Sequence, residues 1–315
     1  MRIMFIGSGE FALPIIKCLN GNFELALCVT RPDKPKGRGK KVSKSVVASL
    51  CEDLNVAVFT PQSINDSESI EFLSKQDVDI AVLASYSEIL KPELISIFKH
   101  GIVNVHPSLL PKYRGAEPIR WAIRKGERET GVSLMVISSK LDRGNVLLQE
   151  TCPIENTDNF DDLRDRLAEM SVSMLPDMVN KVVNGYTGNP QDQTKTFYAR
   201  RMREDDELID WNHSANRISR RVRSMSYSPG CYTFYKGERL KLFNPREIDE
   251  TNNKPGKIIS AKKRLIVGTG VGCIEFLHCQ REGKRMMDST SFLNSRWIEE
   301  DTFFSDSVDF ESKED

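Results

Sequence analysis

Short apolar runs alternate with helical segments in the N-terminal part of the chain, and this alternation is the strongest constraint on the fold. The apolar runs have the length of strands and fall at residues 2–6, 23–30, 56–60, 77–85 and 101–105, followed by further runs at 130–137 and 146–152. Strands and helices that alternate at this spacing predict an α/β fold with a doubly wound, mostly parallel sheet. A long amphipathic helix is expected to follow at 160–184.

The chain changes character beyond this helix. Short strands separated by turns are expected at residues 230–235, 239–243, 257–260, 264–267 and 272–278. Strands at such close, regular spacing predict a small β-barrel. We therefore expect a catalytic domain at 1–188, a linker at 189–205 and a second domain at 206–298.

The remaining residues, 299–315, contain eight acidic side chains and one lysine. Such a composition predicts a disordered acidic tail. The tail also explains why the whole chain is neutral, with 45 basic and 45 acidic residues, although its second domain has several basic segments.

Cysteine content and hydropathy indicate the compartment. The seven cysteines form no CxxC pair and have no metal-ligand spacing with histidine, so we expect reduced core cysteines and no metal. No apolar run reaches about 18 residues, the length that a membrane-spanning helix needs. The sequence therefore predicts a cytoplasmic protein without a membrane partner.

The strand at 101–105 leads into the segment with the most obvious chemistry, NVHPSLLP. Asn104 and His106 lie two residues apart, so on a strand they project from the same face. Asp142 and Gly144 form a turn directly after the strand at 130–137. A carboxylate there could orient His106 or accept a proton, although a histidine at a strand end is also commonly a structural residue.

Three segments in order, NVHPSLLP, KYRGAEPI and ETGVSLMVISSKLDRGNVL, resemble the formyltetrahydrofolate-dependent formyltransferases. The resemblance implies a Rossmann-like catalytic domain, an OB-like C-terminal domain, and a catalytic trio of Asn104, His106 and Asp142. It also implies 10-formyltetrahydrofolate as the formyl donor. The residues expected to contact the folate are Ser108, Leu109, Leu110 and Pro111, with Tyr86, Ile89 and Leu90 as walls of the pterin pocket.

A basic segment follows the second predicted strand. Residues 31–44 contain seven arginines and lysines and one aspartate, with glycines and prolines that predict an irregular loop. The segment is similar to the insertion loop by which the tRNA-acting members of the family engage the acceptor arm of initiator tRNA. The expected tRNA contacts are Lys36, Arg38, Lys40 and Lys41, with Arg38 the foremost. The resemblance thus implies a monomeric enzyme that formylates the α-amino group of initiator methionyl-tRNA in translation initiation.

Two other functions fit parts of the sequence. Relatives within the family formylate sugar-nucleotide or other small-molecule amines, which would not require the basic loop. The run from Gly7 through Gly9 to Ala12 also fits a loose dinucleotide fingerprint, and Arg31 could bind a 2′-phosphate, as in an NADP-dependent oxidoreductase. That fingerprint lacks the acidic residue that normally follows about 20 residues later.

Overall fold

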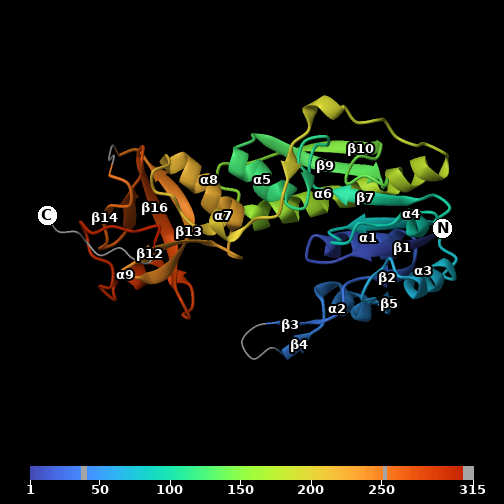
Figure 1. The fold of residues 1–315 in the computed structure, drawn as a ribbon, viewed down its shortest axis with the longest axis horizontal. Coiled ribbons are helices and arrows are strands. Elements are labelled where there is room, and N and C mark those ends of the chain that lie inside the picture. Colours follow the sequence, from blue (N-terminus) through green and yellow to red (C-terminus); the bar gives the residue numbers. More distant parts are fainter. Residues whose placement is uncertain (37–40, 251–253, 308–315) are drawn as a thin grey trace. The chain divides into compact units, whose positions relative to one another are not determined.

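A computed structural model describes residues 1–36, 41–250 and 254–307. This part of the chain forms two compact units (Figure 1). The first unit contains Met1–Pro118, Glu129–Pro153 and Leu163–Arg200; the second contains Ile119–Arg128, Ile154–Asp162 and the chain from Arg201 onward. The segment expected to be a linker, 189–205, is therefore divided between the two units. No helix in the described ranges is both long enough and apolar enough to cross a lipid bilayer.

A single large sheet forms the centre of the first unit. Its strands are β1 (Arg2–Gly7), β2 (Glu24–Val29), β5 (Val58–Phe59), β6 (Ile80–Ala84), β7 (Ile102–His106), β9 (Glu129–Val136) and β10 (Val146–Pro153). Their order across the sheet is β10, β9, β7, β6, β1, β2, β5. The strands from β7 to β5 run parallel, whereas β9 and β10 are antiparallel to their neighbours. This confirms the predicted mostly parallel sheet.

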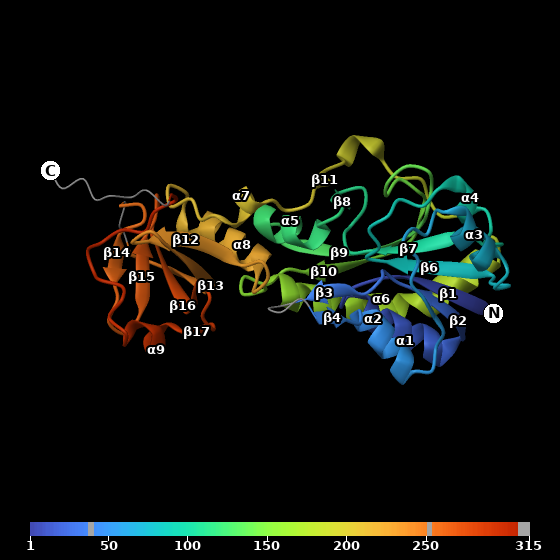
Figure 2. The ribbon, with the colours of Figure 1, turned by 60° about the horizontal axis from the view of Figure 1, so that its bottom comes forward.

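Helices cover both faces of this sheet. They are α1 (Ala12–Asn22), α2 (Val46–Asp53), α3 (Ser67–Ser74), α4 (Pro92–Ile95) and α6 (Phe160–Val183). Figure 2 shows α1, α2 and α6 on one side of the sheet and α3 and α4 on the other. The chain builds outward from β1 through β2 and β5, and then from β6 to β7 in the opposite direction. Ligands of such sheets bind at the carboxyl ends of the strands beside this reversal, which is where β1, β6 and β7 end.

The basic segment contains more regular structure than expected. Strand β3 (Lys34–Lys36) pairs antiparallel with β4 (Lys41–Ser43). The expectation that glycines and prolines exclude regular structure is wrong for these two flanks. Both strands of a two-stranded ribbon are edge strands, where a proline such as Pro35 is tolerated. Arg38 and Lys40 lie outside the described residues.

A smaller pair of strands connects two distant segments of the first unit. Strand β8 (Arg114–Gly115) pairs in parallel with β11 (Tyr198–Ala199), just after the short 3₁₀ helix η1 (Gln193–Lys195). The residues before Arg201 are therefore an ordered part of the first unit, not a connector between domains.

The second unit contains an antiparallel sheet and several helices. Its strands are β12 (Cys231–Tyr235), β13 (Glu238–Ile248), β14 (Ile258–Ser260), β15 (Leu265–Gly268), β16 (Cys273–Arg281) and β17 (Met287–Asp288). Its helices are α5 (Pro118–Lys125), α7 (Glu204–Glu207), α8 (Ala215–Met225) and α9 (Ser289–Leu293). The first residue of α5, Pro118, still belongs to the first unit. The sheet order β12, β13, β16, β15, β14, with β17 beside β16, forms an antiparallel half-barrel where a small OB-like β-barrel was predicted.

Residues 301–305 bridge the two edges of this half-barrel. Phe304 N–H donates to the carbonyl of Gly256 beside β14, and Ser305 exchanges two backbone hydrogen bonds with Phe234 of β12. Phe304 is buried and stacks on Trp211. The prediction of a disordered tail from residue 299 is therefore wrong for residues 299–307, because these apolar and backbone contacts hold the segment despite its acidic composition.

Replacing Phe304 by alanine is expected to destabilise the second unit by about 3–5 kcal/mol, the usual effect of removing a buried phenylalanine. Its ring centroid lies 5.6 Å from that of Trp211 and 5.7 Å from that of Tyr235. Urea unfolding followed by tryptophan fluorescence measures the effect, since all three tryptophans, Trp121, Trp211 and Trp297, lie in this unit. The neighbouring Phe303→Ala, at a side chain that is 42% exposed, is the matched control. Equal destabilisation by both variants would contradict this role of Phe304.

Candidate active site

Asn104 and His106 lie at the carboxyl end of β7, as the strand pattern predicts. They project from the same face of the strand, and both are buried, with exposures of 7% and 4%. Strand β7, an interior strand, supplies these polar groups from within an apolar sheet. Because burial of polar groups requires compensating partners, their surroundings determine what they can do.

Asp142 reaches these two residues from the turn after β9. Its Oδ1 accepts a hydrogen bond from Asn104 Nδ2 at 3.4 Å, and its Oδ2 lies 3.8 Å from His106 Nδ1. Its Oδ2 also accepts from the backbone N–H of Gly115 at 2.8 Å. The structure therefore brings the three residues of the expected trio together in a buried cluster.

The turn that carries Asp142 has an unusual backbone. Asp142 has a φ of 49°, in the left-handed region that short polar side chains tolerate better than most others. Gly144 follows because a Cβ at this position would lie 1.7 Å from the carbonyl oxygen of Val136. The tight packing of this turn against the end of β9 thus sets the direction of the Asp142 carboxylate.

A backbone carbonyl fixes the orientation of the His106 ring. Nε2 of His106 lies 2.9 Å from the carbonyl oxygen of Tyr113. A carbonyl can only accept, so Nε2 carries a proton and donates it to this bond. The 3.8 Å between Nδ1 and Asp142 exceeds hydrogen-bond length, so Nδ1 faces the carboxylate without bonding to it.

The loop after His106 is held by two side chains that the sequence did not single out. Ser133 on β9 donates to the carbonyl of Ser108 at 2.5 Å and accepts from the N–H of Leu110 at 3.0 Å. Gln149 on β10 donates to Ser133 Oγ at 2.7 Å and to the carbonyl of Leu110 at 3.0 Å. The segment from Ser108 to Pro111 is therefore fixed in place by the two antiparallel strands.

The expected walls of the pterin pocket have different environments. Leu90 is buried in an apolar cluster with Leu94 and Ile102, against which Tyr86 and Ile137 pack. Ile137 directly follows β9 and leads towards the Asp142 turn. Ile89, by contrast, is 66% exposed and does not belong to this cluster. Burial, and then the nearby Glu88 carboxylate, raise the pKa of Tyr86, so its hydroxyl remains protonated.

A cavity of about 280 Å³ adjoins the loop at Leu110 and Pro111. Residues 146–149 and 189–192 complete its lining, including Gln149 and Gln191. Pockets for whole small-molecule ligands usually measure about 300–1,000 Å³, so this cavity could accommodate only part of a folate. Tyr86, Ile89 and Leu90 do not line it.

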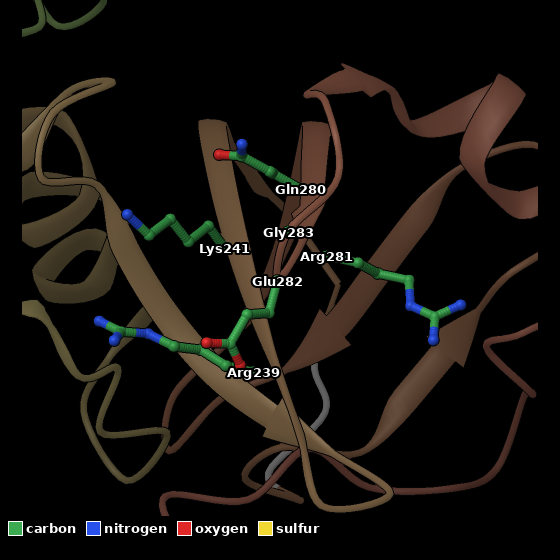
Figure 3. A pocket seen from close by; sticks show the side chains of 6 residues that line it. All are labelled: Arg239, Lys241, Gln280, Arg281, Glu282 and Gly283. Atoms are coloured by element: carbon green, nitrogen blue, oxygen red, sulfur yellow. The ribbon is translucent and has the colours of Figure 1, made fainter. Parts of the chain in front are cut away.

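In the second unit, a cavity of about 250 Å³ is lined by Arg239, Lys241, Gln280, Arg281, Glu282 and Gly283. Figure 3 shows Arg239 and Lys241 pointing to one side of the strands and Arg281 to the other. The Arg239 guanidinium pairs with Glu207 at 3.2 Å, and that of Arg281 with Glu238 at 2.6 Å. Burial, and then the nearby Arg239, lower the pKa of Lys241.

Comparison with known proteins identifies the family. A family profile described as formyl transferase matches residues 1–179, and one described as formyl transferase, C-terminal domain, matches residues 201–296. The methionyl-tRNA formyltransferase of Thermodesulfovibrio yellowstonii is 39% identical over 300 residues, covering 95% of this chain and 97% of the relative. That of Thermotoga maritima is 36% identical over 301 residues, covering 95% and 96%.

The chain belongs to the methionyl-tRNA formyltransferases. This formyltransferase shares its fold with more distant solved structures. HypX from Aquifex aeolicus, in complex with tetrahydrofolic acid, covers 96% of this chain with 48% of its own length, a TM-score of 0.66 and 19% identity. WlaRD, a sugar 3N-formyl transferase solved with dTDP and 5-N-formyl-THF, covers 90% of the chain and 99% of its own length, with a TM-score of 0.65 and 20% identity.

Several residues of this formyltransferase site could not be found from the sequence pattern. The partner of His106 is a backbone carbonyl and one partner of Asp142 is a backbone N–H, so no side chain marks them. Both lie in the KYRGAEPI segment, which carried the resemblance without an assigned role. Gln191, which bonds to the backbone of the Asp142 turn, lies in the segment that was predicted to be a linker.

Proposed function

We propose that this enzyme transfers the formyl group of 10-formyltetrahydrofolate to the α-amino group of methionine on initiator methionyl-tRNA, with Asn104, His106 and Asp142 as the reacting set. The observation that carries this proposal is the meeting of the three side chains at the end of β7, in a chain of this family. The family assignment replaces the nicotinamide oxidoreductase interpretation.

The reaction begins when the neutral amine attacks the formyl carbon. A carbon–nitrogen bond forms, and the formyl oxygen becomes a tetrahedral oxyanion. Asn104 donates an amide N–H to this oxygen, and protonated His106 donates from Nδ1, the ring nitrogen not bonded to Tyr113. One positioned oxyanion donor typically accelerates such a reaction by about 10²–10³.

Asp142 is proposed to orient His106 and to accept the amine proton. Its carboxylate faces His106 Nδ1 and holds the ring until the amine attacks, and it then takes the amine proton through a water molecule. Collapse of the intermediate breaks the bond between the formyl carbon and N10 of the folate, and N10 takes up the proton that the amine released. Positioned proton transfer contributes about 10²–10⁴ in rate.

The donor is proposed to lie along two segments of the first unit. Ser108, Leu109, Leu110 and Pro111 form a bend and a turn whose backbone is fixed by Ser133 and Gln149. Tyr86 and Leu90 supply an apolar face that continues to Ile137, next to the Asp142 turn. A flat pterin requires such apolar faces with a few polar groups at its edge. The exposed Ile89 is the least supported of the predicted contacts.

A direct comparison of acceptors tests the function. The enzyme is incubated with 10-formyltetrahydrofolate carrying a labelled formyl carbon, and with either initiator methionyl-tRNA or an aminosugar nucleotide. We expect label on the methionine of the tRNA only. Labelling of the sugar nucleotide with none on the tRNA would reject the proposed acceptor.

Neutralising Lys36, Arg38, Lys40 and Lys41 together is expected to raise the KM for methionyl-tRNA and leave folate binding unchanged. Phosphate contacts make affinity fall with salt, with a log–log slope of about 0.7–0.9 for each phosphate neutralised. The variant should therefore show a shallower salt dependence of kcat/KM for tRNA.

The matched control neutralises four exposed lysines elsewhere in the first unit, Lys17, Lys75, Lys91 and Lys99, and so changes the net charge by the same amount. If the control raises the KM for methionyl-tRNA as much as the loop variant does, total charge accounts for the effect. The proposed tRNA contacts of the loop would then be rejected.

A further inference from the structure

Gln191 uses its whole amide to connect two parts of the site. Its Nε2 donates to the carbonyl of Asp142 at 3.0 Å and to that of Gly144 at 2.7 Å. Its Oε1 accepts from Nε of Arg114 at 3.1 Å and from Nη2 of Arg114 at 2.5 Å. Both amide protons and both lone pairs of the amide oxygen are thus engaged, which is the full hydrogen-bonding capacity of this group.

Arg114 links Gln191 to the other side of the same carboxylate. Arg114 is buried, with 4% of its surface exposed, and its Nη1 also donates to Gln193 at 3.1 Å. The next residue, Gly115, donates its backbone N–H to Asp142 Oδ2. Gln191 therefore holds the backbone beneath Asp142 and, through Arg114, the strand whose N–H binds the Asp142 side chain.

The Asp142 turn depends on such contacts because the sheet does not fix it. Asp142 lies outside β9 and β10 and has a left-handed φ of 49°. Two carbonyls of the turn, at Asp142 and Gly144, point to one side chain. Arg143 lies between them. Burial, and then the positive charge of Arg143, lower the pKa of Arg114, whereas the negative charge of Asp142 raises it. The charges of the turn and of β8 are therefore close enough to influence each other.

We propose that Gln191 is a positioning residue for formyl transfer, which sets the place of the Asp142 carboxylate against His106 and Asn104 without contacting the reacting atoms itself. This inference rests on the role of Asp142 proposed above. A displacement of about 1 Å in a reacting group can cost about 100-fold in rate. Loss of Gln191 is therefore expected to lower kcat by about 10- to 100-fold and to leave both KM values nearly unchanged.

Two substitutions at this position separate its two functions. Gln191→Glu keeps an acceptor for Arg114 but replaces the donor to the two carbonyls by a carboxylate oxygen. Gln191→Met has a similar volume and removes both kinds of hydrogen bond. If the inference is correct, both variants lose kcat, because both lose the bonds to the turn. Full activity of Gln191→Glu and Gln191→Met would overturn it. Thr194→Val, an exposed change on the same segment, is the control that should retain wild-type kcat.

A double-mutant cycle with Asp142→Asn distinguishes positioning from general support of the fold. If Gln191 acts through Asp142, the double variant Gln191→Met/Asp142→Asn should be no slower than Asp142→Asn alone, since groups that act as a unit are not additive. If the two losses multiply, Gln191 acts independently of Asp142 and the inference fails. If Asp142→Asn alone keeps full activity, it is the proposed catalytic role of Asp142 that fails.

Discussion

Asparagine in place of Asp142 is expected to lower kcat by about 10²–10⁴, the range that positioned proton transfer usually contributes. The change keeps the shape of the side chain but removes its charge. It also puts an amide N–H against either Asn104 Nδ2 or the N–H of Gly115, both of which donate to the native carboxylate. The variant can therefore neither stabilise a charged His106 nor take the amine proton.

Steady-state kinetics with both substrates measures this effect. An interaction made only in the transition state lowers kcat and kcat/KM equally, so the two KM values should hardly change. Asp177→Asn is the control, since Asp177 is a 57% exposed carboxylate of α6 that pairs only loosely with Lys181 at 3.6 Å. A kcat within a few-fold of wild type for Asp142→Asn would exclude Asp142 from the chemistry.

Replacing His106 is expected to reduce kcat by about 10²–10³, the usual effect of losing one donor to an oxyanion. Alanine removes both ring nitrogens, so neither the oxyanion nor the carbonyl of Tyr113 finds a donor at this position. A buried carbonyl that loses a hydrogen-bond donor destabilises a fold by about 1–3 kcal/mol. The alanine variant should therefore be somewhat less stable than the wild type as well as slower.

Glutamine at position 106 separates the two effects. Its amide N–H can still donate to Tyr113, but it cannot become a cation opposite Asp142. We expect His106→Gln to unfold close to the wild-type urea midpoint and still to show most of the loss in kcat. Wild-type turnover in a folded His106→Gln would remove the imidazole from the mechanism.

The sequence was sufficient to predict the parallel core and the meeting of the trio. The alternation of apolar strands with helices is strong in this chain, and the carboxyl ends of neighbouring strands must lie at one edge of a sheet. Asn104 and His106 follow directly from the two-residue period of β7. Asp142 was placed beside them by the resemblance to the formyltransferases, since β9 is antiparallel to β7 and the end of β9 at Val136 lies beside Val103.

The partners of the trio could not be predicted because they depend on contacts that carry no local pattern. Gln191 lies in an irregular, polar stretch, and its partners are carbonyls 47 and 49 positions earlier in the chain. Ser133 and Gln149 look like ordinary strand residues until β9 and β10 are paired. The order of residues 301–305 was missed for a different reason. The many acidic residues around this segment predict disorder, whereas the buried side chain of Phe304 holds it in the second unit.

The bridge at residues 301–305 also bears on synthesis of the protein. Strand β12 completes its hydrogen bonding only with Ser305, about 70 residues further along the chain. A ribosome adds residues at roughly 5–20 per second, so the aromatic surface around Trp211 stays accessible to chaperones for several seconds after β12 has emerged. Premature termination anywhere between β12 and Ser305 would leave the edge of β12 at Phe234 unpaired, and an unpaired strand edge is the kind of surface that favours aggregation.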